Sequence, residues 1–125
     1  RIACELTDEI AGLATVAGGY FVDDPCEASR PIPVITFVSR NDTVVPLDGN
    51  EILMPFAEWR LGWVANNNCI LSPGVTNLEG LTISQYDDCD DDTWVVSYIY
   101  DSVGHTYPPT AVDNIWSFFV LFATD

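Results

Sequence analysis

The sequence predicts an α/β fold in which a mostly parallel β-sheet is flanked by helices. Three observations lead to this prediction. Strand-like runs rich in β-branched residues alternate along the chain with segments of helical spacing. The run "IPVITFV" (residues 32–38) is apolar throughout, which is typical of a strand covered on both faces in a parallel sheet. Helical segments also stand between buried strands, as the crossovers of a parallel sheet require.

The first half of the chain is expected to hold a helix, two strands and a second helix. The chain starts as if within a helix, and Thr7 followed by two acids predicts a helix start. "GLATVAGG" (12–19) is expected to be a short buried strand, and 21–31 a polar connection to the strand at 32–38. A second helix is expected from about Pro55 into the asparagine run. Its apolar residues recur near helical spacing: Phe56, Trp59, Trp63 and Val64.

The second half is expected to hold a hairpin, a strand and a final helix. Residues 74–80 and 81–89 are strand-like with a turn between them, and "TWVVSYIY" (93–100) is a further strand. A Gly/Pro loop follows at 101–110, before an amphipathic helix at 110–123. Thr110 and Asp113 resemble a capping box at its start. The residues expected to share one face of this helix are Val112, Ile115, Trp116 and Phe119.

The composition indicates one acidic, folded domain. The chain has 125 residues, is 48% hydrophobic and carries 19 acidic against 4 basic residues, a net charge of −15. Such a charge repels phosphate groups, so neither nucleic acid nor an anionic membrane is expected as a partner. The acidity is interpreted as solubility in a salty or extracellular medium. With no signal peptide and no initiator Met, we take the chain to be a processed or truncated piece.

No metal and no cofactor are predicted. The run "DDCDDDTW" (87–94) holds five aspartates, but it lacks the glycine and glutamate of an EF-hand loop, so a solvated hairpin turn is expected. The four cysteines lack zinc-site spacing, and a single histidine cannot complete a zinc site. An even number of widely spaced cysteines indicates disulfides and an oxidising compartment. Four cysteines allow three pairings, and the spacing alone does not choose among them.

Two residues follow buried strands at the edge where parallel sheets place their sites. Asp42 follows the strand at 32–38, and His105 follows the strand at 93–100. An aspartate that orients a histidine base makes two thirds of a Ser-His-Asp triad, and the order acid then histidine is that of α/β-hydrolases. Alternatively, Asp42 only forms a turn after the strand and His105 only makes a structural hydrogen bond. The position of both residues at the ends of two strands, in this order, favours the interpretation that they are catalytic.

These segments resemble the secreted polyhydroxybutyrate depolymerase and feruloyl esterase family of α/β-hydrolases. "RPIPVITFVSRNDTVVPLDG" resembles the family's strand-and-acid segment, and "VGHTYP" resembles its Gly-His-Thr-Trp-Pro histidine motif. "AEWRLGWVANNNC" resembles its tryptophan-bearing helix, and "VDNIWSFF" its last helix. The opening "RIACELTDEIAGLATVAGG" resembles the segment after the nucleophile elbow. The resemblance implies that residues 1–125 are the C-terminal portion of a single α/β-hydrolase catalytic domain, without its nucleophile-bearing N-terminal part.

The resemblance also implies roles for particular residues. It makes Asp42 the triad acid and His105 the base, and it makes Tyr107, which stands where the family has tryptophan, a substrate-binding residue. It implies a disulfide between Cys69 and Cys89, which leaves Cys4 to pair with Cys26.

The chain departs from the family at two further places. Val38-Ser39 replaces the family's usual His-Gly, and Gly-x-Ser-x-Gly is absent from the sequence. The serines that lack this context are Ser29, Ser39, Ser72, Ser84, Ser97, Ser102 and Ser117. The strand at 12–19 is then expected to present a bare edge where a preceding strand belongs.

The function that follows is a secreted serine carboxylic-ester hydrolase acting on a polyester or a plant cell-wall phenolic ester. This chain would supply the acid and the base, and the N-terminal half of the same domain would be its partner. The alternative is a non-catalytic secreted α/β-hydrolase-like domain that binds a carbohydrate or a partner. The aromatic residues that could serve such binding are Trp59, Trp63, Trp94 and Tyr107. A third alternative is an acidic cation-binding module.

Overall fold

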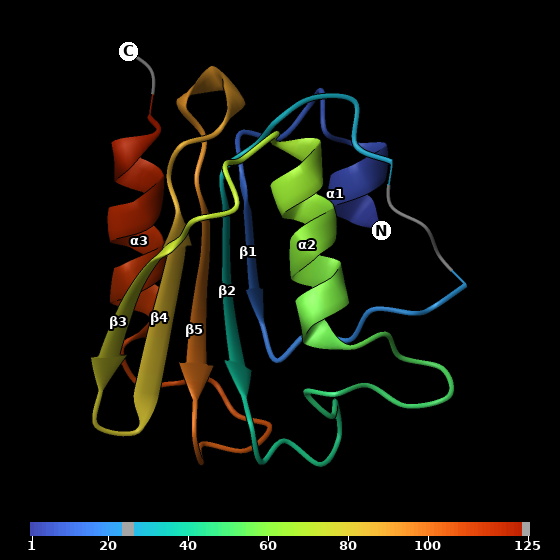
Figure 1. Cartoon of the computed structure of the whole chain (residues 1–125), viewed down its shortest axis with the longest axis vertical. Coiled ribbons are helices and arrows are strands. Elements are labelled where there is room, and N and C mark those ends of the chain that lie inside the picture. The colour runs from blue at the N-terminus through green and yellow to red at the C-terminus, as the bar shows by residue number, and fades with distance from the viewer. Residues whose placement is uncertain (24–26, 124–125) are drawn as a thin grey trace.

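A computed structural model describes residues 1–23 and 27–123, which form an α/β fold around a mixed five-stranded sheet (Figure 1). The helices are α1 (Ile2–Glu5), α2 (Phe56–Asn66) and α3 (Ala111–Leu121), with a short 3-10 helix, η1 (Asp90–Asp92). The strands are β1 (Leu13–Val16), β2 (Val34–Ser39), β3 (Gly74–Leu78), β4 (Leu81–Tyr86) and β5 (Val95–Tyr100). The predicted order of helix, two strands, helix, hairpin, strand and helix is confirmed.

The sheet is less parallel than predicted. Its strand order is β1-β2-β5-β4-β3, and β1, β2 and β5 run parallel, whereas β4 is antiparallel to both β5 and β3. The prediction of a mostly parallel sheet was therefore wrong. The reason is that both connections are short, Glu79–Gly80 between β3 and β4 and residues 87–94 between β4 and β5. Parallel neighbours need a crossover of about a dozen residues or more, so both pairs are antiparallel. Gly80 takes the positive φ of 71° that the tight turn before β4 needs.

Strand β2 is the centre of the parallel part, as its sequence predicted. It pairs with β1 on one side and with β5 on the other. Val34, Ile35 and Phe37 are no more than 2% exposed, so both faces of the strand are covered. The apolar run without alternation is thus explained by burial on both sides.

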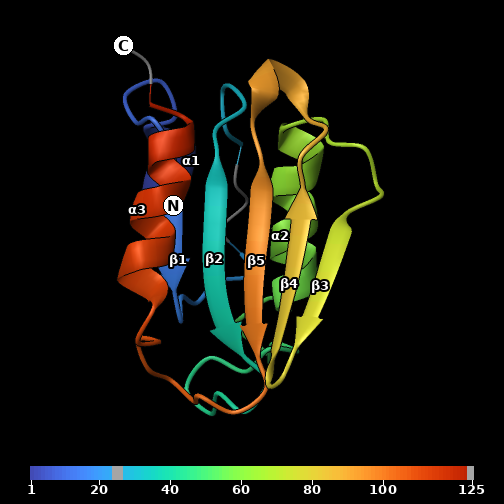
Figure 2. The same cartoon turned by 90° about the vertical axis from the view of Figure 1, so that its left-hand side faces the viewer.

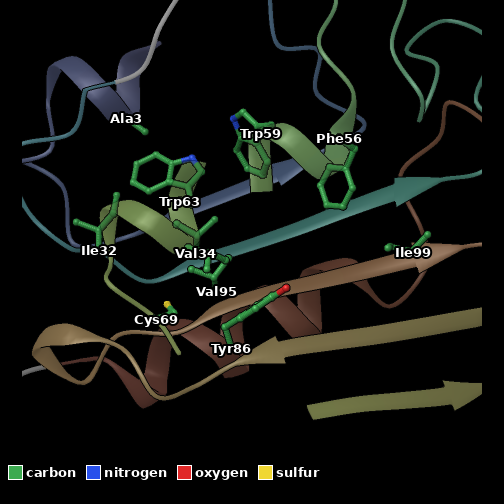
Figure 3. Close-up of a cluster of buried hydrophobic side chains, with 11 residues drawn as sticks. Ala3, Ile32, Val34, Phe56, Trp59, Trp63, Cys69, Tyr86, Val95 and Ile99 are labelled. Atoms are coloured by element: carbon green, nitrogen blue, oxygen red, sulfur yellow. The ribbon is translucent and has the colours of Figure 1, made fainter. Parts of the chain in front are cut away.

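Helices cover both faces of the sheet, with α2 on one face and α3 on the other (Figures 1 and 2). The predicted apolar face of α2 is confirmed, since Phe56, Trp59, Trp63 and Val64 are all buried. These side chains pack over Val34 and Val95 of the sheet and meet Ala3 of α1 in one core cluster (Figure 3). Burial of each large apolar side chain contributes about 1.5–3 kcal/mol, so this cluster anchors the first layer.

Helix α3 turns part of its predicted apolar face to the sheet. Ala111 and Phe118 are buried against Ile35, Phe37 and Val96, in a second core cluster. Of the residues expected on the buried face, Ile115 and Phe119 pack against this cluster. The other two, Val112 and Trp116, are 61% and 71% exposed. Apolar residues lie on both the docked and the exposed side of the helix, so periodicity placed the docking face only in part. Thr110 stands at the N-cap but its side chain makes no capping bond, so the capping-box prediction was wrong.

The first helix ends where a helix start was predicted. Helix α1 finishes at Glu5, and the hydroxyl of Thr7 reaches back to the carbonyl oxygens of Ala3 and Cys4, at 3.1 and 2.9 Å. Threonine hydroxyls often bond carbonyls three or four residues earlier, so Thr7 caps the end of α1 rather than the start of another helix.

The disulfide predicted between Cys69 and Cys89 is confirmed, and it ties the chain beyond α2 to the connection between β4 and β5. Cys26 lies outside the described residues, so its predicted pairing with Cys4 stays a prediction. The acidic run at 87–92 is exposed apart from Cys89 and links two antiparallel strands.

Within residues 1–23 and 27–123 no three His, Cys, Asp or Glu side chains are grouped to hold a metal ion. No helix in the same ranges is long and apolar enough to cross a membrane.

Candidate active site at the carboxyl edge of the sheet

Two loops meet at the carboxyl edge of the parallel strands. Because β2 and β5 are neighbours and run parallel, the loops that follow them leave the sheet at the same end (Figures 1 and 2). The first loop carries Asp42 and the second carries His105. Nδ1 of His105 lies 2.9 Å from Oδ2 of Asp42, so the contact expected from the sequence is present.

The carboxylate of Asp42 uses its two oxygens for two different contacts. Oδ1 accepts hydrogen bonds from the backbone N–H groups of Val44 and Val45, at 2.9 and 2.8 Å. Oδ2 faces His105, and the Asp42 side chain is only 3% exposed. The turn-forming role and the acid role that the sequence left as alternatives are therefore compatible, because each uses a different oxygen.

The surroundings of Asp42 keep its carboxyl group ionised. Burial acts to raise its pKa, but the hydrogen bonds from Val45, from His105 and from Val44 outweigh burial and lower the pKa below the ordinary value of 3.8. An ionised carboxylate only accepts hydrogen bonds, so Nδ1 of His105 carries the proton between them. In a neutral ring this leaves Nε2 as the unprotonated nitrogen, which can act as a base.

The histidine is reachable from solvent, whereas its partner is not. The His105 side chain is 40% exposed, against 3% for Asp42. Val44 and Tyr107, each two residues beyond one member of the pair, are 63% and 55% exposed. A cavity of about 10 Å³ beside Asp42 is lined by Tyr20, among others, and is too small for more than one water.

None of the seven serines, all of which lie in the described part of the chain, is hydrogen-bonded to His105. Three of them are buried, namely Ser39, Ser84 and Ser97, and two of these make other hydrogen bonds. Ser97 Oγ accepts from the guanidinium of Arg60 at 3.1 Å, and Ser39 bonds to the loop before His105. A groove of about 970 Å³ between α1 and α2 is lined by neither Asp42 nor His105.

Two further residues of the site were not singled out by the sequence. Ser39 and Asn41 bond to the backbone of Val103 and Gly104, just before His105. Their position in the sequence could have indicated this role, because they follow a central strand at the edge where the loop of the neighbouring parallel strand also lies.

The resemblance to α/β-hydrolases rests on short sequence motifs. The structure shows in addition that Asp42 and His105 are hydrogen-bonded. Comparison with known protein families and with curated proteins finds no match to this chain.

Proposed function

We propose that this chain supplies the acid and the general base of a secreted serine carboxylic-ester hydrolase. The observation that carries the proposal is the hydrogen bond between the buried carboxylate of Asp42 and the exposed imidazole of His105. The two residues come from neighbouring parallel strands and meet at the edge where α/β folds place their sites.

The geometry fits a general-base role. Nε2 of His105 would take the proton of a serine hydroxyl as that oxygen attacks the ester carbonyl, and Asp42 would stabilise the imidazolium that forms. The imidazolium would then return the proton to the leaving alcohol, which leaves an acyl-enzyme. Water attacks the acyl-enzyme with the same base, and the serine regains its proton as the acid is released.

The serine and the oxyanion hole would come from an N-terminal half of the same hydrolase domain, outside this chain. Two surfaces support this proposal. The outer edge of β1 pairs with no strand in the described part of the chain, so it can accept one. Helix α3 also exposes apolar side chains that a further layer could cover, with Trp116 71% exposed.

The proposed substrate is a polyester or a plant cell-wall phenolic ester. Both carry apolar acyl groups, and the exposed side chains of Val44 and Tyr107 offer apolar and aromatic surface near the base. The disulfide between Cys69 and Cys89 supports secretion into an oxidising compartment.

The alternative of a non-catalytic binding domain gains less support. Trp59 and Trp63 are 8% and 3% exposed and belong to the core, where no carbohydrate can reach them. Trp94 packs edge-on against Phe122. Among the aromatic residues proposed for binding, Tyr107 is the exposed one, and it lies two residues from His105.

The test begins with the coding sequence upstream of Arg1. We expect a Gly-x-Ser-x-Gly motif there, and we expect the longer protein to hydrolyse p-nitrophenyl butyrate, hydroxybutyrate oligomers or methyl ferulate. His105→Gln and Asp42→Asn should each lower kcat by about 10³–10⁴-fold, because the base is lost or its tautomer is wrong.

The matched control is Asp48→Asn, which removes an exposed carboxylate in the same loop and should leave kcat unchanged. Near-normal activity of His105→Gln, or clear turnover by residues 1–125 alone, would overturn the proposal.

A further inference from the structure

We propose that Ser39 and Asn41 are positioning residues that anchor the loop of His105 to the loop of Asp42. This inference rests on the proposed function, because it assigns them to the base of that site. Neither residue is hydrogen-bonded to the imidazole, whose bond is to Asp42. Ser39 accepts hydrogen bonds from the backbone N–H groups of Val103 and Gly104, and Asn41 accepts one from Gly104, the residue just before His105.

The hydroxyl of Ser39 lies at the centre of the arrangement. Ser39 is 2% exposed, and its Oγ accepts hydrogen bonds from the N–H groups of Val103 and Gly104, at 3.1 and 3.2 Å. The same hydroxyl donates to Oδ1 of Asn41, at 2.7 Å. A glycine, which the resemblance places at this position, would make none of these bonds.

The carboxamide of Asn41 completes the arrangement. Its Oδ1 accepts a second bond from the N–H of Gly104, at 2.8 Å, besides the bond from Ser39. Gly104 has a φ of 64°, a conformation that favours glycine, so the chain turns sharply at the anchored residue. The position of the turn just before His105 is thus set by two side chains of the neighbouring loop.

The loop of His105 needs its own anchor, because the bonds that hold Asp42 come from the loop of Asp42 itself. The bonds from Val44 and Val45 fix the carboxylate within its own loop. The remaining side-chain link between the loops, the ion pair of Arg40 with Asp101, joins side chains that are 51% and 59% exposed and is screened by water. Ser39 and Asn41 therefore determine where His105 lies relative to a fixed acceptor.

The experiment uses the ring nitrogens of His105 in the 125-residue chain. Because the sequence has one histidine, ¹⁵N NMR at a pH where the ring is neutral reports this residue alone. In the wild type we expect the Nδ1-protonated tautomer to predominate. In Ser39→Ala/Asn41→Ala we expect that fraction to fall, and the amide protons of Val103 and Gly104 to exchange about 10-fold faster, as the loss of one hydrogen bond implies.

Three variants separate positioning from a merely structural role. Asn41→Ala alone, at an exposed position that leaves the core intact, should shift the tautomer in the same direction. Asn41→Asp keeps an acceptor for Gly104 and should retain the wild-type signature. Asn50→Ala removes a carboxamide that accepts from Ile52 and Leu53 in another turn, and should not affect His105.

The outcomes distinguish this inference from the proposed function. A wild-type ring without the Nδ1-protonated form would overturn the Asp42–His105 pair itself, and with it the function. A wild-type tautomer that persists in both folded alanine variants would overturn the positioning role and leave the pair intact.

Discussion

At the scale of single residues, Asp42 shows how one carboxylate can make two separate contacts. One oxygen closes the turn after β2 and the other holds His105. Its lowered pKa follows from these hydrogen bonds, which outweigh the effect of burial. The same contacts that keep the acid ionised also stabilise the folded chain.

Replacing Asp42 should reveal this link between charge and stability. Asp42→Asn puts an amide N–H opposite Nδ1 of His105, and we expect a loss of about 1–3 kcal/mol in the free energy of unfolding at pH 7. The pKa of Asp42 is lower in the folded chain than in the unfolded chain. Its carboxylate therefore stabilises the fold fully when the pH is above the unfolded-state pKa, and this stabilisation is lost as the pH falls through the folded-state pKa. Urea denaturation should therefore show the gap between wild type and variant narrowing below about pH 3.8.

Asp48→Asn is the control, because this exposed carboxylate makes no hydrogen bond within residues 1–23 and 27–123. A gap for Asp42→Asn that stays the same from pH 7 to pH 3 would contradict the assignment of the lowered pKa.

At the scale of elements, the pairing of β2 with β5 determines the site. The register places Ser39 opposite Tyr100, and the N–H of Arg40 donates to the carbonyl of Tyr100 at 2.8 Å. The two loops thus leave the sheet side by side. A slip of one residue in this register would turn the side chains of one strand to the opposite face and separate the loops.

The disulfide between Cys69 and Cys89 holds a second pair of elements together. It closes a loop with a sequence separation of 20 residues between α2 and the acidic connection. In Cys69→Ala/Cys89→Ala we expect a loss of about 3 kcal/mol in the free energy of unfolding, because the unfolded chain gains freedom. Urea denaturation without reductant measures this loss.

The single variant Cys89→Ala should lose about as much as the double variant, since either substitution breaks the same bond. If the loss of unfolding free energy in the double variant equalled the sum of the losses in the two single variants, the losses would reflect packing of the side chains and not the cross-link.

At the scale of the whole molecule, one side of the fold carries apolar surface that it does not cover itself. Val112, Trp116 and Val120 recur every four residues along α3 and are 61%, 71% and 53% exposed. Helix α3 lies close to the beginning of β1, since Phe119 packs against Gly12. The stripe on α3 and the outer edge of β1 are the surfaces that the proposed N-terminal half would cover.

This surface should make the isolated chain associate when its charge is screened. A net charge of −15 opposes contact between copies, and salt weakens that repulsion. We expect sedimentation analysis to show more association at 0.5 M salt than at about 0.05 M salt. Trp116→Gln should reduce this association and change the free energy of unfolding by no more than about 0.5 kcal/mol.

Trp63→Gln is the contrasting variant, because Trp63 is buried and its replacement should destabilise the fold strongly. Association of Trp116→Gln equal to that of the wild type would show that the α3 stripe is not the contact surface.

Local patterns in the sequence determined the elements and the positions of the two site residues. The apolar run of β2, the spacing of Trp59 and Trp63 in α2, and the turn before β4 each depend on neighbours within a few residues. Asp42 and His105 could be placed at one edge because parallel strands end together. These features were predictable because they depend on residues close together in the sequence and on the rule that neighbouring parallel strands end at the same edge.

Tertiary structure alone decided the features that depend on residues far apart in the chain. The docking face of α3 was predicted only in part, because apolar residues lie on both its docked and its exposed side. The contact of Asp42 with His105 and the anchoring of Gly104 by Ser39 join residues more than 60 positions apart in the sequence. Such contacts exist only once β2 and β5 are paired, because hydrogen bonding requires atoms within about 3 Å of each other.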